Sequence, residues 1–377
     1  MDRLTRYRDD LADLAGQSRL RVLAPRAGID FASNDYLGLA GSDRLARAAR
    51  AAIDAGVPVG AAGSRLLRGN TDAQACFEDE AARYFGAGAA LGFGGGYVAN
   101  FAVLTTLPQR GDLLLMDELS HASTHEGARA GRAEVAGFRH GDVGHAADVI
   151  TKWRAGGATG AVWIAVESLY SMDGDRAPLA ELAQLADDHG FLLVDEAHAT
   201  GVYGPGGRGL AHDLEGRDNV ITLHTLGKAL GGSGALICGA RVLIDVLINR
   251  CRPFIFATAP SPLMAEIGRE SLRMLADEPW RQAELQGHIA AFNARLAQHV
   301  PHVPVSGSQI VPLIVGGNAE TMALAAAVQA RGFDVRGIRP PTVPDGTSRL
   351  RVSLTLNVCR EQVESLAETL GELWPDL

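Results

Sequence analysis

The sequence predicts an α/β fold with a mainly parallel sheet in a large domain and a smaller α+β domain at the C-terminus. Between residues 89 and 239, short apolar runs alternate with amphipathic segments of helical period, a pattern typical of parallel strands joined by helices. After about residue 240 longer helical segments replace this alternation. The chain has 377 residues, more than a single core usually holds. We therefore expect an N-terminal helix and arm (1–35), a large domain (36–275) and a small domain (276–377).

The expected elements follow from the spacing of apolar residues, which recur about every 3.6 residues in helices and form short continuous runs in buried strands. Helices are expected first at 1–16, 42–55 and 71–85. The alternating region then holds strands at 89–93, 113–116, 134–138, 161–166, 191–194, 220–223 and 235–238. Helices between them are expected at 97–106, 123–130, 145–153 and 178–189. The remainder contains helices at 241–250, 261–276, 280–299, 319–331 and 361–373, and strands at 310–315 and 349–354.

Composition excludes several classes of protein. The net charge of −9 argues against general nucleic-acid binding. No apolar run approaches 18 residues, and the N-terminus lacks the apolar centre of a signal peptide. The four cysteines are scattered without a CxxC pair, which is typical of free thiols in a reducing compartment. We therefore expect a cytoplasmic protein that does not span a membrane.

Lys228 is the first candidate for chemistry. It lies in ITLHTLGKALGGSG, residues 221–234, where no other Lys, Arg, Asp or Glu occurs. A lysine among Gly, Ala and Leu is poorly solvated, and this favours its neutral, nucleophilic amine. Such amines form Schiff bases with aldehydes, above all with pyridoxal phosphate. Taken alone, a lysine after a strand is more often a surface residue, so the decision depends on the other motifs.

Asp195 and His198 form the second candidate. Asp195 ends the apolar run FLLVD, and ligands of open parallel sheets bind beyond the carboxyl ends of the strands. A carboxylate there could hold the protonated nitrogen of a pyridine ring, and His198 is close enough in sequence to reach the same ligand. These residues alone leave an alternative open, in which Asp195 only caps the end of the strand and His198 is a solvated histidine.

Two further segments could complete a cofactor site. GFGGGYVAN, residues 92–100, places glycines before a helix, where Gly96 and Tyr97 could contact a phosphate; a tight turn is equally consistent, and the dinucleotide pattern GxGxxG is not met. His121 could stack on a cofactor ring or lie in a solvated loop. His121 and His125 lack the glutamate of HExxH, so we expect no metal site.

Together these segments resemble the α-oxoamine synthases, pyridoxal phosphate-dependent enzymes of the aspartate aminotransferase fold, fold type I. The similar segments follow the order of that family over nearly the whole chain. They are SNDYLGL (33–39), AAGSRLLRGN (61–70), GGGYVAN (94–100), LSHAST (119–124), YSMDGDRAPL (170–179), VDEAHATGVYG (194–204), TLGKALG (225–231) and FATAPSP (256–262). Within the family, IRPPTVPDGTSRLR (338–351) is similar to the member that acts in biotin biosynthesis.

The resemblance implies roles for individual residues. Lys228 would carry the cofactor as a Schiff base, with Asp195 at the pyridine nitrogen, His198 at the ring oxygen and His121 stacked on the ring. The other cofactor-binding positions that it implies are Gly96, Tyr97, Glu167, Ser171, Thr225 and, reaching a partner subunit's site, Thr258. The implied substrate-binding positions are Arg19, Asn34, Arg339, Thr342 and Arg351, with the choice between Arg19 and Arg21 open.

The resemblance also implies an activity and partners. It predicts a homodimeric acyltransferase that condenses L-alanine with a pimeloyl thioester, carried by CoA or an acyl carrier protein, with loss of CO₂. Another α-oxoamine synthase, using glycine or serine with a different acyl-CoA, is the alternative. An inactive binding protein of the same fold is disfavoured because Lys228, Asp195, His198 and His121 are all present.

Overall fold

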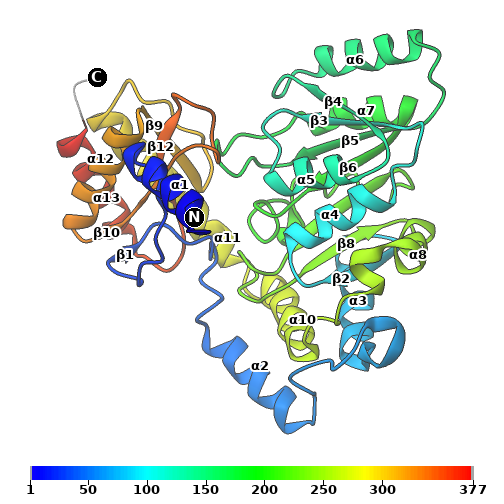
Figure 1. Cartoon of the computed structure of the whole chain (residues 1–377). Coiled ribbons are helices and arrows are strands. Elements are labelled where there is room, and N and C mark those ends of the chain that lie inside the picture. The colour runs from blue at the N-terminus through cyan, green and yellow to red at the C-terminus, as the bar shows by residue number, and fades with distance from the viewer. Residues whose placement is uncertain (1, 375–377) are drawn as a thin grey trace. The chain divides into compact units, whose positions relative to one another are not determined.

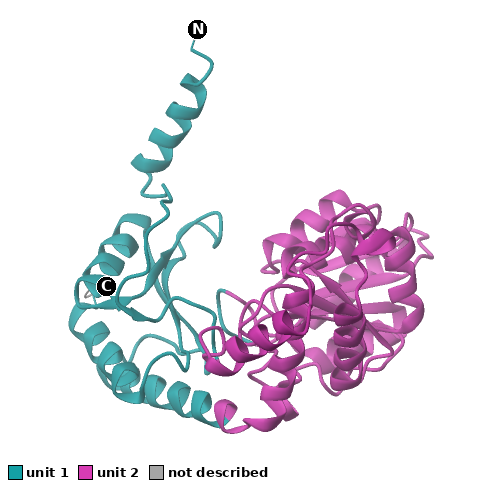
Figure 2. Ribbon diagram, turned by 90° about the horizontal axis from the view of Figure 1, so that it is seen from below, with its two compact units in different colours: residues 1–36, 172–175, 283–377 teal, residues 37–171, 176–282 magenta. Residues whose placement is uncertain are grey.

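The computed structural model describes residues 2–374, and the chain divides into two compact units. Unit 1 comprises Met1–Tyr36, Met172–Asp175 and Ala283–Leu377, and unit 2 comprises Leu37–Ser171 and Arg176–Gln282 (Figure 2, teal and magenta). This division differs from the three expected segments, because the N-terminal arm belongs with the C-terminal region. The physical reason is pairing: β1 (Ile29–Asp30) forms a parallel ladder with β10 (Phe333–Asp334).

Unit 2 is built on one seven-stranded sheet in the order β2-β8-β7-β6-β5-β3-β4. All neighbouring pairs are parallel except those of β8, which is antiparallel to both β2 and β7. The mainly parallel sheet predicted from the sequence is therefore confirmed. The strands are β2 (Ala89–Phe93), β3 (Leu113–Asp117), β4 (Glu134–Phe138), β5 (Val162–Glu167), β6 (Gly190–Asp195), β7 (Val220–Thr225) and β8 (Ala235–Gly239).

Helices cover both faces of this sheet (Figure 1). On one face, α4 (Gly96–Thr106), α5 (Ala122–Ala130) and α8 (Arg241–Arg250) pack on alternate strand residues such as Leu193 and Ile221. On the other, α6 (Val143–Ala155) and α7 (Leu179–His189) pack on the intervening ones, such as Leu192 and Val194. Burial on both faces explains why these strands are continuously apolar.

The rest of unit 2 packs around α10 (Pro262–Asp277). In this helix Gly268 lies against α3 (Asp72–Phe85), so closely that a Cβ atom would be 2.7 Å from the ring of Phe77. Arg44, on α2 (Asp43–Asp54), forms ion pairs with Glu270 and Glu278 at 2.6 and 3.0 Å. The smaller helices are η1 (Arg65–Gly69), η2 (Pro205–Gly207) and α9 (Arg252–Ile255).

Unit 1 contains a three-stranded antiparallel sheet in the order β11-β12-β9. Its strands are β9 (Ile310–Gly316), β11 (Arg336–Ile338) and β12 (Ser348–Ser353). The helices are α1 (Thr5–Gly16), α11 (Trp280–His299, whose first three residues belong to unit 2), α12 (Asn318–Ala330) and α13 (Arg360–Leu373). No residue of α1 is buried.

Most expected elements match the structure to within a few residues. β1, β10 and β11 were not predicted, because strands of two or three residues are too short to show an alternating pattern. Across residues 2–374, no helix combines the length and the apolar character that crossing a membrane requires.

Candidate active site

The carboxyl ends of β3, β5, β6 and β7 meet at one edge of the unit 2 sheet, because these strands are parallel. A cavity of about 180 Å³ lies at this edge. It is lined by Gly96, Tyr97, Asn100, His121, Ser123, Glu167, Asp195, Ala197, His198, Thr225 and Lys228. Tertiary structure therefore gathers residues from five separate segments of the sequence, as expected for a ligand site of an open α/β sheet.

Lys228 lies in the turn between β7 and β8. The Gly231 N–H donates a hydrogen bond to the Lys228 carbonyl at 2.9 Å. Gly231 has φ +66°, and a Cβ atom there would lie 2.5 Å from the backbone nitrogen of Ala40, so the turn requires glycine. The turn holds the Lys228 Nζ 2.7 Å from His198 Nε2. At this distance a proton can pass between the amine and the imidazole.

Asp195 is a buried carboxylate at the end of β6. Its Oδ2 accepts a hydrogen bond from Asn100 Nδ2 at 2.6 Å, and its Oδ1 accepts one from the Ala197 N–H at 2.9 Å. The arrangement suits a carboxylate that pairs with a cationic ring nitrogen.

A chain of hydrogen bonds connects Asp195 to His121. Asn100 Nδ2 also donates to Ser123 Oγ at 3.1 Å, and Ser123 Oγ lies 2.8 Å from His121 Nδ1. The Ser123 N–H donates to the same nitrogen at 3.2 Å, so Nδ1 is an acceptor and Nε2 carries the proton in the neutral ring. Sequence reasoning assigned no role to Asn100 or Ser123, although both lie in the motifs GGGYVAN and LSHAST.

Glu167 is a second buried carboxyl group beside Asp195, its direct partner in the β5–β6 ladder. Burial, together with the negative charge of Asp195, raises the pKa of Glu167 to about 8. Its Oε2 accepts a hydrogen bond from the Ser171 N–H at 3.0 Å, while Oε1 has no hydrogen-bond partner among residues 2–374. The raised pKa favours the protonated form of Glu167, which can donate a hydrogen bond into the cavity.

The N-terminus of α4 supplies the anion-binding part of the cavity. Gly96 begins this helix, and its first backbone N–H groups have no partner within the helix. A Cβ atom at Gly96 would lie 3.9 Å from Thr225 Oγ1, so the hydroxyl is close to the helix start. A helix N-terminus, a buried carboxylate and an amine around one cavity fit the phosphate, the ring nitrogen and the aldehyde of pyridoxal phosphate.

Two predicted cofactor-binding residues lie outside the cavity lining. Ser171 is buried and contributes through its bond to Glu167. Thr258 is exposed on the surface of unit 2. No group of three or more His, Cys, Asp and Glu residues within 2–374 could hold a metal ion.

The predicted substrate-binding residues all belong to unit 1. Arg351 is buried in β12, and its Nη1 donates to Asn34 Oδ1 at 3.1 Å and to Ser353 Oγ at 2.7 Å. Asn34 Oδ1 also accepts a hydrogen bond from the Tyr36 hydroxyl at 3.0 Å. The structure thus brings Arg351 and Asn34 together within this unit.

Three arginines surround the loop of residues 339–342. Arg19 Nε donates to the Pro340 carbonyl at 3.2 Å, Arg21 Nη2 to Thr342 Oγ1 at 3.3 Å, and Arg339 Nη1 to the Ser18 carbonyl at 2.8 Å. Burial and the positive charge of Arg21 lower the pKa of Arg339. No carboxylate of residues 2–374 forms an ion pair with any of the three, so this arginine cluster has a positive charge to offer an anion. Both Arg19 and Arg21 lie at the loop, and the choice between them stays open.

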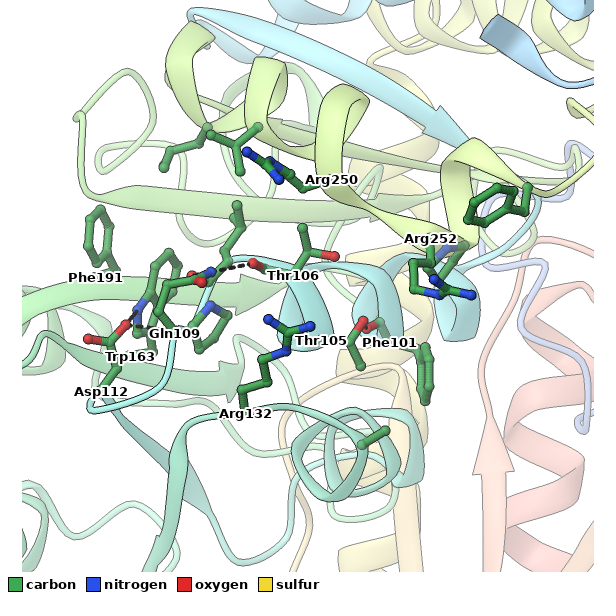
Figure 3. Close-up of a pocket in the computed structure, with 17 residues that line it drawn as sticks. Phe101, Thr105, Thr106, Gln109, Asp112, Arg132, Trp163, Phe191, Arg250 and Arg252 are labelled. Carbon is green, nitrogen blue, oxygen red and sulfur yellow. Dashed lines mark hydrogen bonds between the residues drawn. The ribbon is translucent and has the colours of Figure 1, made fainter. Parts of the chain in front are cut away.

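A larger cavity of about 1150 Å³ lies elsewhere in unit 2, between α4 and α8 (Figure 3). Trp163 and Phe191 stack at its base with ring centroids 4.1 Å apart, and Arg132, Arg250 and Arg252 lie around it. It contains none of the residues predicted to bind cofactor or substrate. We therefore do not assign the catalytic site to this cavity, although it is larger than the one that contains Lys228.

Residues 26–370 match the sequence model described as aminotransferase class I and II, so the chain belongs to this class of pyridoxal phosphate-dependent enzymes. A protein of Anaeromyxobacter dehalogenans named 8-amino-7-oxononanoate synthase is 44% identical over 355 residues, which cover 93% of this chain and 88% of that protein. The chain is therefore a member of the 8-amino-7-oxononanoate synthase family of acyltransferases. This confirms the resemblance found in the sequence motifs.

Solved structures agree on the fold. The 8-amino-7-oxononanoate synthase of Francisella tularensis is similar with a TM-score of 0.77 at 28% identity, over 92% of this chain and 97% of that one. A serine palmitoyltransferase of Sphingomonas wittichii is similar with a TM-score of 0.85, also at 28% identity, over 99% and 98% of the two chains. Fold similarity thus extends to relatives with other names, and the family assignment rests on the 44% identity to the Anaeromyxobacter dehalogenans protein.

Proposed function

We propose that this protein condenses L-alanine with a pimeloyl thioester, releasing CO₂ and the carrier thiol and forming 8-amino-7-oxononanoate. The observation that carries the proposal is the cavity in which Lys228 Nζ lies 2.7 Å from His198 Nε2, beside the buried carboxylate of Asp195. The 44% identity to a protein named for this product supports the choice of reaction. A role in biotin biosynthesis and a cytoplasmic location follow from the same proposal.

The cavity residues would divide the chemistry between them. Pyridoxal phosphate, when bound, supplies an electron sink for the negative charge that develops at the alanine Cα. Lys228 Nζ takes the Cα proton as general base, and His198 Nε2 exchanges a proton with it. Asp195 would hold the protonated pyridine nitrogen, and Glu167, whose pKa burial raises, would donate a hydrogen bond from its carboxyl group.

Unit 1 would supply the groups that recognise substrate. Arg351, held by Asn34, is suited to bind the alanine carboxylate in a two-pronged contact. A pimeloyl group ends in a second carboxyl function, and the cluster of Arg19, Arg21 and Arg339 offers positive charge without a carboxylate partner in residues 2–374. We assign this cluster, with the Thr342 hydroxyl, to the acyl donor.

We further propose that the protein is a homodimer whose interface includes the α4–α8 face of unit 2. Unit 2 has exposed apolar side chains that a monomer would leave in water. They include Leu67, Val242 and Phe256, of which Phe256 lines the larger cavity. Thr258 would then contact the phosphate site of the partner, as the family resemblance implies. A free apolar cavity with an arginine rim (Figure 3) is consistent with a surface that a second copy covers.

The proposal is tested by incubating the purified holoenzyme with L-alanine, glycine or L-serine, each paired with pimeloyl-CoA, pimeloyl-carrier protein or palmitoyl-CoA. We expect 8-amino-7-oxononanoate, identified by mass spectrometry, from L-alanine with a pimeloyl thioester only. The ratio of kcat/KM for the two pimeloyl donors decides whether CoA or the carrier protein is the better substrate. Faster turnover of glycine or serine with palmitoyl-CoA would overturn the proposal in favour of another α-oxoamine synthase activity.

A further inference from the structure

Residues Met172–Asp175 leave unit 2 and join unit 1, although the chain on both sides of them belongs to unit 2. We call these four residues the crossover segment. Its two flanks are held together within unit 2, because Leu169 and Arg176 form an antiparallel bridge and the Ala177 N–H donates to the Ser168 carbonyl at 3.2 Å. The segment is therefore a short loop of fixed base, with its tip docked in unit 1.

A buried arginine of β12 holds the crossover segment. Arg349 Nη1 donates to Asp173 Oδ1 at 2.5 Å and to the Met172 carbonyl at 3.3 Å. Only 4% of the Arg349 side chain is exposed. Deleting the Asp173 carboxylate would leave the Arg349 cation buried without its partner, and such a loss is costly.

Gly174 fixes the same segment by close packing. It has φ +69°, and a Cβ atom there would lie 2.2 Å from the Ile310 carbonyl oxygen and 2.7 Å from Ser308 Oγ. A side chain at this position would push the segment away from β9. The crossover segment can therefore keep its place only with glycine at its tip.

The crossover segment is linked to two groups of residues in the proposed site, to one through the covalent chain and to the other through its contact with Arg349. Its neighbour Ser171 donates its N–H to Glu167, which lines the cofactor cavity. Its anchor Arg349 lies two residues from Arg351, on the same face of β12. A displacement of the segment thus shifts the peptide that holds Glu167, while the anchor shares a strand with the arginine proposed to bind substrate.

We propose that the crossover segment couples strand β12 to the cofactor cavity, with Asp173, Gly174 and Arg349 as positioning residues for the reaction. This rests on the proposed function for the roles of Glu167 and Arg351. In this arrangement, docking of the segment in unit 1 keeps the Ser171 N–H aligned on Glu167 Oε2. Loosening the segment weakens cofactor retention in unit 2, even though the change is made in unit 1.

The test compares Gly174→Ala with Gly307→Ala. Gly307 also belongs to unit 1 and has φ +71°, but nothing lies within 4 Å of a Cβ atom there, so it carries the same backbone strain without the clash. The readouts are the rate at which the holoenzyme releases pyridoxal phosphate and amide hydrogen exchange in residues 166–171. We expect Gly174→Ala to speed release by roughly 2- to 10-fold, the effect of one lost hydrogen bond, and to speed exchange there, whereas Gly307→Ala does neither.

A purely structural role in unit 1 predicts a different result. Gly174→Ala would then lower the melting temperature while cofactor release and exchange in residues 166–171 stay at wild-type values, and this outcome would overturn the proposal. Should Gly174→Ala fail to fold, Asp173→Asn serves instead, because the amide oxygen still accepts from Arg349 but the charge is lost. Neither readout needs an acyl donor, so a failure of the proposed condensation activity is distinguishable from a failure of the coupling.

Discussion

At the scale of single residues, the site depends on how Asp195 is supported. Its two side-chain oxygens accept hydrogen bonds from Asn100 and from the Ala197 N–H, which fix the orientation of the carboxylate. Ser123 extends the support to His121. A ring nitrogen placed against this group would keep its proton, because a nearby opposite charge raises the pKa of a cationic acid.

Asp195→Asn should therefore keep the fold and the cofactor but slow proton removal from the alanine Cα. We expect a decrease of about one to three orders of magnitude, since a paired carboxylate shifts its partner's pKa by roughly 1–3 units. Exchange of the Cα hydrogen in D₂O, followed by NMR without any thioester, measures this. Lys228→Ala is the reference for complete loss of the general base, and wild-type exchange in Asp195→Asn would contradict the assignment.

Glu196, next in sequence, has a different role. It is buried and accepts hydrogen bonds from the N–H groups of Leu210 and Ala211 at 3.0 and 2.6 Å. Burial raises the pKa of Glu196 from 4.5 to about 8. Between these pH values the folded state binds more protons than the unfolded state, so this group makes the protein less stable as the pH rises.

Glu196→Gln removes that titration and one acceptor oxygen. We expect the variant to have a lower melting temperature than the wild type at about pH 5, and the difference to narrow towards about pH 9. The reason is that raising the pH destabilises only the wild type, in which a buried carboxyl group must either lose its proton or hold it against the solution pH. Melting curves over this range measure the gap, and Glu364→Gln, a change on the exposed side of α13, is the surface control. A gap that does not change with pH would contradict the assigned titration.

At the scale of elements, strand β12 and the loop before it serve separate ends of the substrates. Arg351→Ala should weaken alanine binding to the holoenzyme even without thioester, because Arg351 is the buried cation beside Asn34. Thr342→Ala should raise KM for the pimeloyl thioester and leave alanine binding nearly unchanged, because Thr342 contacts Arg21 in the arginine cluster. Spectral titration with alanine, followed by thioester kinetics, separates the two effects. Equal losses of alanine affinity in both variants would refute this division.

The packing of α10 on α3 also depends on one residue. Gly268→Ala would place a Cβ atom 2.7 Å from the buried ring of Phe77, and such overpacking costs typically about 1–3 kcal/mol. In contrast, Gly287→Ala on α11 meets nothing within 4 Å and should stabilise its helix by up to about 1 kcal/mol. Urea unfolding of both variants measures the difference, and a stabilised Gly268→Ala would show that the helices can separate at no cost.

At the scale of the whole molecule, association should control cofactor binding. Phe256→Glu places a charge on an apolar side chain that is 71% exposed in the single chain. If a second copy covers it, the variant should shift to monomer in sedimentation experiments and lose pyridoxal phosphate more readily, because Thr258 no longer reaches the partner. Val305→Glu, on an exposed apolar residue of unit 1, is the control. A variant that remains dimeric with unchanged cofactor affinity would place the interface elsewhere.

The sequence by itself determined the α/β class, the family and the main cavity residues. Continuous apolar strands can only be buried on both faces, and Lys228, Asp195 and Gly96 lie at strand ends or a helix start, where their local sequence already indicates a ligand. Local pattern is sufficient for such features because period and turn chemistry act over a few residues.

Tertiary structure alone decided the features that depend on neighbours far apart in the sequence. His224 is an example: it is fully buried, stacked on Phe85 with ring centroids 3.7 Å apart and hydrogen-bonded to the hydroxyls of Thr200 and Thr222, none of which its place beside Lys228 indicates. The link from Asn100 through Ser123, the raised pKa of Glu167 and the docking of the crossover segment are of the same kind. Each depends on desolvation or on a contact between segments, and these exist only once the strands, helices and loops are packed together.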